Sequence, residues 1–368
     1  MKLYEYLAKE AMAKNGVPTP GGRVATTPDE VAKIAGEVGP CAVKAQVLVG
    51  GRGKAGGIKL ADTPEEARSR GAEILGMNLK GHLVEKVLVE PKLKIDKELY
   101  LSVAVDANAK KPLVIASASG GVNIEEVPEK EIVKRHVDIS LGIYPYFGRE
   151  IARRLGLEGN IAKQFADILA KLYKIFRQYD AELVEINPLV ISGDRVIAAD
   201  GRLNLDDDAL FRHPDFPRVD EGTDLEKEVH ALGLAFVQLD GDIAVMANGA
   251  GMAMGTLDTV SYYGGRPANF LDAGGRASVE PTAEAIKVLL RTRPRAIFIN
   301  IFGGITRCDD VAKAIVQVKA NEGISVPLVV RMVGTNEQKG VEILRQAGIE
   351  AYREMGEAAR KAVALRGV

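Results

Sequence analysis

The chain has 368 residues, of which 46% are hydrophobic and 27% charged, enough for two or three domains with cores of their own. Its 49 basic residues nearly balance its 50 acidic ones, so the overall charge does not favour a nucleic acid or a membrane surface as a partner. Trp is absent and Phe and Tyr are sparse, which argues against aromatic stacking on nucleic acid.

The first residues and the cysteine content indicate a reducing compartment. The segment MKLYEYLAKEAMAKNG alternates charged and apolar residues at helical spacing, unlike the apolar region of a signal peptide, and no apolar run is long enough to span a membrane. Cys41 and Cys308 are too few and too far apart for a disulfide framework or a cysteine-based zinc site. We therefore expect a cytoplasmic protein, or one in an equivalent reducing space.

The first half of the sequence mixes helices and hairpins. Residues 27–30 (TPDE) and 63–66 (TPEE) each place Thr at an N-cap, Pro at the first helical position and Glu at the third, which predicts a capped helix start. Apolar, β-branched runs predict strands at residues 41–47 and 84–90 and in the segments ELYLSVAVD and PLVIASA. A long amphipathic helix is expected at residues 160–179, with its apolar stripe in the core.

Residues 184–201 (VEINPLVISGDRVIAADG) predict a hairpin with a tight Gly193-Asp194 turn. A two-residue loop fixes the register, so Asn187 should lie opposite Asp200, with facing Cβ atoms about 4.5–5.5 Å apart. An amide oxygen and a carboxylate are hard ligands suited to Mg²⁺. Glu185 is expected on the same face. The alternative is the polar outer face of an ordinary hairpin.

The glycine-rich segment GGRGKAGG, residues 50–57, follows a predicted strand that contains Lys44. Its glycines allow close approach of a ligand to the backbone, and Arg52, Lys54 and Lys44 supply positive charge for phosphate. The Walker spacing G-x-x-x-x-G-K-[ST] is missing, so a different nucleotide fold is required. A mobile basic surface loop is the alternative.

The style of the sequence changes near residue 220. Residues 210–224 contain two prolines and no periodicity, which predicts a linker. Beyond it, strand, glycine loop and helix repeat in turn, which indicates a doubly wound parallel sheet whose loops gather at one ligand-binding edge. The glycines expected at that edge are Gly249, Gly251, Gly274, Gly275, Gly303, Gly304 and Gly334.

Two loops of this second half suggest ligand chemistry. NGAGMAMG, residues 248–255, with Asp272 after the next strand, invites a dinucleotide interpretation, although its glycine spacing is one residue longer than the usual fingerprint. In NIFGGITRCDD, residues 300–310, backbone N–H groups ahead of a helix can hold a carboxylate or a phosphoryl group. Plain helix packing and a tight turn are the alternatives, and Cys308 is expected to pack in the core.

Taken in order, LYEYLAKE, VKAQV-x-x-GGRGKAGG, KELYL, EINPLV with ADG, NGAGMAMGT, ANFLDAGG and NIFGGITRCD closely resemble the beta subunits of succinyl-CoA synthetase, the ADP-forming succinate–CoA ligases. The resemblance spans essentially the whole chain, although malate–CoA ligase and ATP-citrate lyase chains share many of these motifs. It implies an α/β protein: an α+β ATP-grasp domain at residues 1–220, with a small subdomain at about 20–97, and a flavodoxin-like domain at 221–368 with a doubly wound parallel sheet.

The resemblance also implies site residues. Asn187 and Asp200 would be Mg²⁺ ligands, and Glu185 resembles the acid that orients a migrating histidine near the nucleotide. The residues implied to contact ATP or ADP are Lys44, Gly51, Arg52, Gly53, Glu90, Glu98 and, through its backbone, Leu93. The residues implied to contact succinate and the phosphohistidine are Asn248, Gly304, Ile305 and Thr306, the last standing where close relatives are expected to have Val.

The implied reaction is ATP + succinate + CoA ⇌ ADP + phosphate + succinyl-CoA in the citric acid cycle, through a phosphohistidine on a separate alpha subunit. This chain would bind Mg²⁺, ATP and succinate, whereas CoA would bind through the alpha subunit, in a heterodimer or heterotetramer. The four histidines of the chain lie outside the glycine loops and have no evident activating neighbours. They are His82, His136, His213 and His230.

Three alternatives remain. Malate–CoA ligase, or another ADP-forming acyl-CoA synthetase, keeps the fold, but malate-type chains tend to have Ala where this chain has Gly255 and Gly303. A non-catalytic nucleotide-binding regulatory subunit would not need a metal pair together with Glu185. An NAD-dependent dehydrogenase leaves GGRGKAGG and the hairpin unexplained. Pro20 leans toward ATP over GTP.

Overall fold

The computed structural model describes residues 1–219, 222–274 and 278–367. The chain divides into two compact units, Met1–Glu221 and Gly222–Val368, which we describe separately. The boundary predicted between residues 220 and 221 and the predicted edge residue Gly275 lie outside the described residues. Over those described ranges, the helices are all too short or too polar to cross a membrane.

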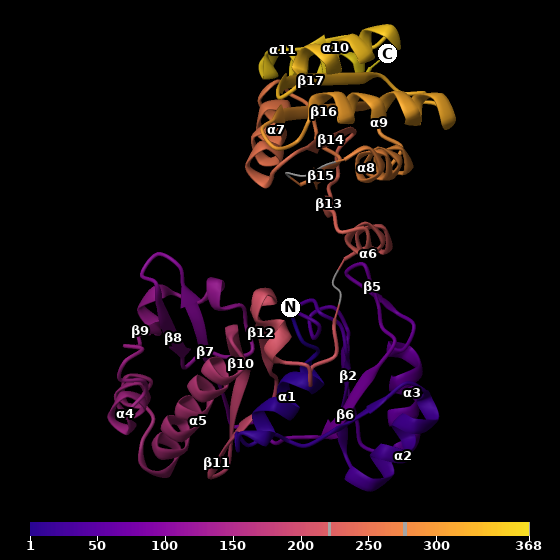
Figure 1. Cartoon of the computed structure of the whole chain (residues 1–368). Coiled ribbons are helices and arrows are strands. Elements are labelled where there is room, and N and C mark those ends of the chain that lie inside the picture. Colours follow the sequence, from indigo (N-terminus) through magenta and orange to yellow (C-terminus); the bar gives the residue numbers. More distant parts are fainter. Residues whose placement is uncertain (220–221, 275–277, 368) are drawn as a thin grey trace. The chain divides into compact units, whose positions relative to one another are not determined.

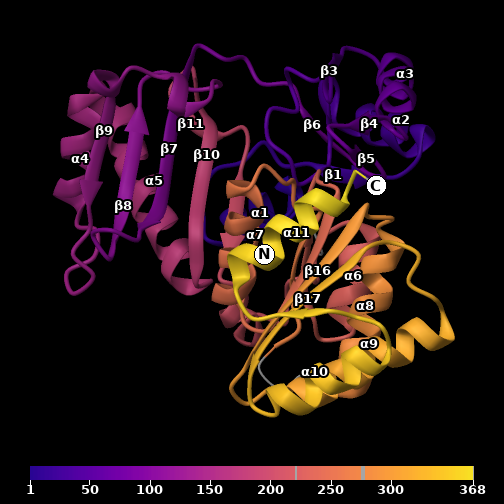
Figure 2. The same cartoon turned by 90° about the horizontal axis from the view of Figure 1, so that it is seen from above.

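The described residues of the first unit form two main antiparallel sheets and a two-stranded one, β4-β5 (Figure 1). The smaller main sheet has the strand order β1-β6-β2-β3, and the larger has the order β11-β10-β7-β8-β9, with β12 paired to β10. In Figures 1 and 2, α2 and α3 accompany the smaller sheet and α4 and α5 the larger one. The strands are β1 (Arg23–Ala25), β2 (Cys41–Ala45), β3 (Ile58–Ala61), β4 (Asn78–Leu79), β5 (His82–Leu83), β6 (Val87–Pro91), β7 (Lys97–Asp106), β8 (Lys111–Ser117), β9 (Ile132–His136), β10 (Ala181–Ser192), β11 (Arg195–Ala198) and β12 (Arg202–Leu205).

The helices of this unit begin where the sequence predicts them. Thr27 Oγ1 accepts a hydrogen bond from the Glu30 N–H (3.3 Å), and Thr63 Oγ1 accepts one from Glu66 (3.2 Å). The predicted apolar stripe of the long helix is confirmed, because its Phe165, Ile168, Leu172 and Ile175 are all buried in the core of the larger sheet. The helices are α1 (Glu5–Lys14), α2 (Pro28–Val38), α3 (Pro64–Ile74), α4 (Pro145–Arg154) and α5 (Gly159–Gln178), with short 3-10 turns η1 (Ile124–Glu126), η2 (Glu129–Glu131) and η3 (Asp207–Arg212).

The predicted hairpin is formed by β10 and β11 in the expected register. Ser192 faces Arg195 across the turn, Leu189 faces Ala198, and Gly193 has the positive φ (60°) that the tight turn requires. Strand β11 then ends, and β12 continues the pairing with β10 from Glu185 opposite Arg202. Asn187 and Asp200 therefore lie in the opening between the two paired stretches.

The second unit is built on one sheet with the order β13-β15-β14-β16-β17-β18. Its five parallel strands follow the flavodoxin-like order 2-1-3-4-5. The expectation of a wholly parallel sheet is corrected at one edge, because the short strand β13 pairs antiparallel with β15. The elements are α6 (Asp224–Ala231), β13 (Ala235–Gln238), β14 (Ile243–Ala247), α7 (Ala250–Tyr262), β15 (Asn269–Asp272), α8 (Val279–Arg291), β16 (Ala296–Gly303), α9 (Cys308–Asn321), β17 (Leu328–Gly334), α10 (Glu337–Gln346), β18 (Ala351–Tyr352) and α11 (Met355–Leu365).

Apolar cores cover both faces of this sheet. Successive residues of β14 point to opposite faces, so Ala244 and Met246 pack with α8 and α9, whereas Ile243 and Val245 pack with α7 and α11. Burial on both faces explains why these strands are continuous apolar runs in the sequence. It also leaves the glycine loops that follow the strands at the carboxyl edge of the sheet.

Candidate functional site

A cavity of about 330 Å³ in the first unit brings together the glycine-rich loop, the hairpin and the loop that follows β8. Six of the residues predicted as nucleotide, metal or catalytic residues line it: Gly51, Arg52, Gly53, Glu185, Asn187 and Asp200. Lys44, Glu90, Leu93 and Glu98 lie outside this lining. Two of those four, Lys44 and Glu90, connect to the cavity through a network of ionic contacts.

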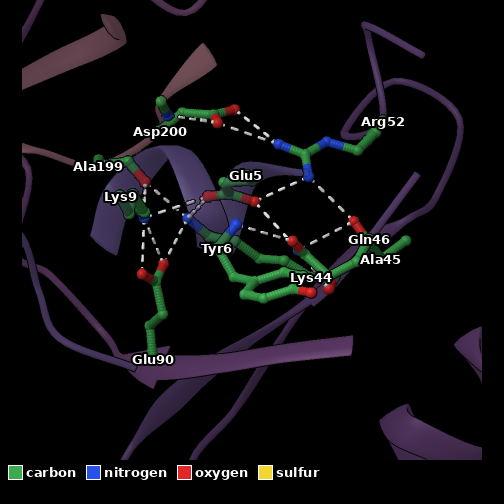
Figure 3. Close-up of polar contacts among 11 residues, drawn as sticks. Glu5, Tyr6, Lys9, Lys44, Ala45, Gln46, Arg52, Glu90, Ala199 and Asp200 are labelled. Atoms are coloured by element: carbon green, nitrogen blue, oxygen red, sulfur yellow. Dashed lines mark hydrogen bonds and ion pairs between the residues drawn. The ribbon is translucent and has the colours of Figure 1, made fainter. Parts of the chain in front are cut away.

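Lys44, on β2, lies in the middle of that network (Figure 3). Its Nζ is 2.7 Å from Glu90 Oε2 and 3.2 Å from Glu5 Oε1, and it donates a hydrogen bond to the Ala199 carbonyl (2.7 Å). Glu90 comes from the neighbouring strand β6 and is 2% exposed. The predicted phosphate-binding lysine is therefore already paired with two buried carboxylates.

Arg52, from the glycine-rich loop, joins the network to the cavity (Figure 3). Its Nη1 lies 2.8 Å from Glu5 Oε2 and donates to the Ala45 carbonyl (3.0 Å). Its Nη2 donates to both carboxylate oxygens of Asp200, each at 3.0 Å. A predicted phosphate ligand and a predicted metal ligand thus form a bidentate ion pair.

Helix α1 contributes two members that the sequence reasoning missed, Glu5 and Lys9. Lys9 Nζ donates to both oxygens of Glu90 (2.6 and 2.8 Å) and to the Ala199 carbonyl (2.7 Å). Both side chains are buried, on the helix face that also carries Met12. Their spacing could have indicated that they are buried. Residues 5, 9 and 12 share one face of a helix, so this face places an acid and a base beside apolar residues.

The network balances its charges. Its carboxylates are Glu5, Glu90 and Asp200, and its cations are Lys9, Lys44 and Arg52. Burial raises the pKa of Glu5, but the nearby cations reverse this and hold that pKa well below its usual value. Burial lowers the pKa of Lys44, but the carboxylates of Glu5 and Glu90 raise it by a larger amount. The net shift of this pKa is therefore upward. The three carboxylates and the three cations therefore balance in formal charge.

Glu185 faces the cavity from β10, with Tyr100 of β7 behind it. The Tyr100 hydroxyl donates a 2.7 Å hydrogen bond to Glu185 Oε2. Burial raises the pKa of Glu185, and burial together with Glu185 raises that of Tyr100. Tyr100 was missed because the contact depends on the long-range pairing of β10 with β7, in which Glu185 faces Ser102.

Asn187 and Asp200 both line the cavity with oxygen donors, the ligand type that Mg²⁺ prefers. Asn187 is held by the loop after β8, because its Oδ1 accepts from the Gly121 N–H (2.8 Å) and its Nδ2 donates to the Val122 carbonyl (3.0 Å). Among the described residues, groups of three or more His, Cys, Asp or Glu able to hold a metal are absent. The donor set fits a cation that takes its remaining ligands from phosphates and water.

The two remaining predicted nucleotide residues, Leu93 and Glu98, lie beside the hairpin. Leu93 is partly buried against Val190, Ile197 and Ala199. Glu98 lies on β7 opposite Val190, and its backbone carbonyl accepts a hydrogen bond from Gly120 (3.1 Å). These contacts place Leu93 and Glu98 beside the hairpin and outside the cavity lining.

In the second unit, Asn248 connects the ends of β14 and β16, the point where the strand order reverses. Its Oδ1 accepts from the Phe302 N–H (2.8 Å), and its Nδ2 donates to the Phe302 carbonyl (2.8 Å) and to Thr306 Oγ1 (3.3 Å). The amide therefore shapes the loop that carries Gly304 and Ile305. Ile305 is 77% exposed, whereas Thr306 is buried.

Two acidic residues at the carboxyl edge of the second sheet also hold loops in place. Asp272 Oδ1 accepts hydrogen bonds from the N–H groups of Gly249 (2.6 Å) and Gly274 (2.7 Å). These bonds occupy the carboxylate oxygen that a dinucleotide site would use to bind a ribose. Asp309 is fully buried and accepts from Asn336 Nδ2 (2.9 Å). Cys308 is buried, as predicted, and burial raises the pKa of its thiol.

The histidines lie away from the cavity lining. His136 Nε2 is 2.8 Å from Asp106, and His213 Nε2 is 2.8 Å from Asp180. His230 contacts the Phe236 carbonyl at 3.1 Å.

Comparison with known proteins defines the class. The ATP-grasp domain family matches residues 2–191, and the CoA-ligase family matches residues 246–365. The chain is therefore an ATP-grasp protein with a CoA-ligase domain, the class that its two folds indicate. Over 99% of both chains, its fold also matches a structure of ATP citrate lyase from Methanothrix soehngenii in complex with citrate and coenzyme A, with a TM-score of 0.74 and 20% sequence identity.

Curated relatives give a narrower assignment. The chain is 48% identical to the succinate–CoA ligase [ADP-forming] subunit beta of Methanothermobacter thermautotrophicus and 45% identical to that of Ignicoccus hospitalis, over 99% of each chain in both cases. It belongs to the family of beta subunits of ADP-forming succinate–CoA ligases. The resemblance inferred from the motifs is confirmed.

Proposed function

We propose that this chain is the beta subunit of a succinate–CoA ligase that, with an alpha subunit, converts ATP, succinate and CoA to ADP, phosphate and succinyl-CoA. The cavity of the first unit carries the proposal. It combines a basic glycine loop, two oxygen donors for a cation and a buried acid in a chain of this family.

The nucleotide phosphates would bind at the glycine-rich loop. Arg52 reaches the cavity directly, and Lys44 stands behind it on β2. Backbone N–H groups near Gly51 and Gly53 add donors that need no side chain. Asn187 and Asp200 would hold Mg²⁺, which when bound neutralises charge on the transferring phosphoryl group.

Glu185 would receive the histidine that carries the phosphoryl group. A carboxylate that accepts a hydrogen bond from one imidazole nitrogen fixes which nitrogen reacts. The Tyr100 hydrogen bond holds Glu185 Oε2, and Glu185 Oε1 would make the contact with the histidine. The histidine would come from the alpha subunit, because the chain's own histidines do not line the cavity.

The carboxyl edge of the second unit would bind succinate and meet the alpha subunit. Helix α9 begins directly after the loop of Gly304 and Thr306, and helix N-termini with free N–H groups favour carboxylates and phosphoryl groups. Met254, Phe302 and Ile305 are all more than half exposed here, as expected of a surface that a partner covers. A heterodimer or a heterotetramer satisfies this arrangement.

Gly303 favours succinate over malate as the acid. A Cβ atom at this position would lie 2.8 Å from the Thr335 amide nitrogen and 2.9 Å from Cys308 Sγ, so the Ala expected in malate-type chains would require the loop to move. At Gly255 nothing lies within 4 Å of an added Cβ, so that position does not discriminate. The buried free cysteines, Cys41 and Cys308, agree with a cytoplasmic location.

One assay tests the function. The chain, co-purified with its alpha subunit, should form succinyl-CoA from succinate and ATP faster than it forms malyl-CoA from malate, and faster with ATP than with GTP. The chain alone should form none. Nucleotide binding without turnover by the complex would instead support a regulatory subunit.

A further inference from the structure

Arg52 and Asp200 are each other's partner in this structure, although the proposed function needs both for other ligands. The bidentate contact joins Arg52 Nη2 to both Asp200 oxygens at 3.0 Å. Asp200 must face a divalent cation in the working enzyme, and Arg52 must face a phosphate. Neither can happen while the pair stays closed.

Charge balance opposes a cation that arrives by itself. The carboxylates and cations of the network are matched, so Asp200 is already neutralised by Arg52. A divalent ion at Asp200 would lie within a few ångströms of a guanidinium that is 8% exposed, where solvent screens the repulsion poorly. The same argument holds for a phosphate at Arg52 beside the Asp200 carboxylate.

The guanidinium has a second anchor that does not involve Asp200. Its Nη1 contacts Glu5 Oε2 (2.8 Å) and the Ala45 carbonyl (3.0 Å), and both lie on the side of the network away from the hairpin. Glu5 is 4% exposed and is itself held by Lys9 (3.1 Å). Arg52 can therefore release Asp200 through Nη2 and still be positioned by Glu5.

We propose that Arg52 is a resident counter-ion of Asp200 that exchanges partners when metal and nucleotide enter together. Arg52 passes from Asp200 to a nucleotide phosphate, and Asp200 passes from Arg52 to the divalent cation. The inference rests on the proposed nucleotide site. Its consequence is positive coupling, because each ligand frees the group that the other requires.

Mn²⁺ binding to the full chain, followed by electron paramagnetic resonance with and without ADP, tests the exchange. Wild-type protein should bind free Mn²⁺ weakly and should bind it at least ten-fold more tightly when ADP is present. Arg52→Gln should bind Mn²⁺ at least ten-fold more tightly than wild type without ADP, and ADP should then add little. Equal or weaker Mn²⁺ binding by Arg52→Gln would overturn the proposal.

Three further variants sharpen the result. Arg68→Gln makes the same substitution on the surface, where Arg68 pairs with Asp29 (2.6 Å), and should match wild type. The double variant Arg52→Gln/Asp200→Asn should lose the gain in Mn²⁺ affinity that Arg52→Gln alone shows. If the gain persists, the cation does not bind at Asp200, and the exchange is overturned. Arg52→Lys keeps the charge but loses the second nitrogen, which contacts Glu5 and the Ala45 carbonyl, and should fall between wild type and Arg52→Gln.

Two more measurements distinguish a failure of the proposed exchange from a misfolded variant and from a wrong proposed function. Circular dichroism melting shows whether Arg52→Gln is folded. If it is not, Arg52→Lys replaces it in the Mn²⁺ experiment. An Mn²⁺ affinity of Arg52→Lys no higher than that of wild type would then overturn the proposal. Succinyl-CoA formation by the wild-type complex decides the proposed function independently. Normal turnover with no effect of Arg52 on Mn²⁺ affinity would reject the exchange alone.

Discussion

The two units build their candidate sites from different materials. In the first unit, Arg52 and Asp200 line the cavity and pair with each other, and Lys44, outside the lining, pairs with Glu90. In the second unit, Asn248 and Asp272 are committed to the loops, and what remains for a ligand is backbone. The first site must exchange partners to bind a ligand, whereas the second is already shaped for one.

The difference follows from the strands that support each site. Parallel strands in the second unit end at one edge, where the first turns of α7 and α9 leave N–H groups without helical partners. The cavity of the first unit is lined by charged side chains such as Arg52 and Asp200, so we expect that site to depend on side-chain charge. We therefore expect charge changes to affect the first site and changes of backbone shape to affect the second.

The largest effect is expected from Asp200→Asn. It removes a charge at the cavity while keeping the side-chain shape, so phosphorylation of the alpha subunit with Mg-ATP should fall by a hundred-fold or more, on the order of 3 kcal/mol or above. Asp194→Asn, in the exposed turn of the same hairpin, is the matched control and should retain activity. Near-normal phosphorylation by Asp200→Asn would remove Asp200 from the metal site.

Lys9→Met tests whether the first site depends on charge balance. The side chain is 5% exposed and pairs with Glu90 at 2.6 Å, and removing one partner of a buried pair typically costs about 3–5 kcal/mol. Urea unfolding should report a loss of that order. Lys33→Met, at an exposed position of α2, should change stability by less than about 0.5 kcal/mol.

Acid should weaken the same network. Because the cations hold the pKa of Glu5 below its unfolded value, Glu5 contributes stability that is fully present above about pH 4.3 and is lost as the pH falls through the folded pKa. Glu5→Gln should therefore be less stable than wild type at pH 7. That difference should shrink below about pH 4; a gap that does not change with pH would mean that Glu5 acts by packing alone.

Gly303→Ala tests the second site by shape. The added methyl would crowd the Thr335 nitrogen at 2.8 Å, so stability should fall by about 1–3 kcal/mol and the KM for succinate should rise several-fold. Nucleotide affinity should not change. Gly255→Ala, in α7 with open space around it, should be neutral or stabilising. An unaltered KM in Gly303→Ala would argue that succinate binds elsewhere.

The smallest effect is expected from Tyr100→Phe. Losing the 2.7 Å hydrogen bond leaves Glu185 in the cavity but less well oriented, so kcat should fall about three- to ten-fold while the KM for ATP stays constant. Tyr173→Phe, in the core of the same unit, controls for the loss of a hydroxyl. Parallel changes in kcat and KM would indicate a general distortion of the cavity.

What the sequence could predict depended on how local the determining contacts are. The register of β10 and β11 was predictable because a two-residue turn sets it, and the strands of the second unit were predictable because burial on both faces makes them continuous apolar runs. Strand β13 was missed because three of its four residues are exposed. Helix α6 was missed because it starts within the proline-containing segment interpreted as a linker.

The ionic network lay beyond prediction for a physical reason. A charged residue on a helix ordinarily indicates solvent, so Glu5 and Lys9 look like surface positions until their partners are known. Those partners come from β2, the glycine-rich loop, β6 and the residue that follows β11, all distant along the chain. Lys44 and Arg52 were predicted from the basic glycine-rich segment and Asp200 from the hairpin register, but their ionic contacts depend on the tertiary fold.

The Ala199 carbonyl accepts hydrogen bonds from both Lys9 and Lys44, across 190 and 155 residues of chain. During synthesis, α1 emerges long before this carbonyl exists, so the two lysines cannot complete their contacts until residue 199 has been made. Contacts of such long range are slow to form. Asp200 also lines the candidate nucleotide cavity, so a nascent chain that stops before residue 199 cannot complete that cavity.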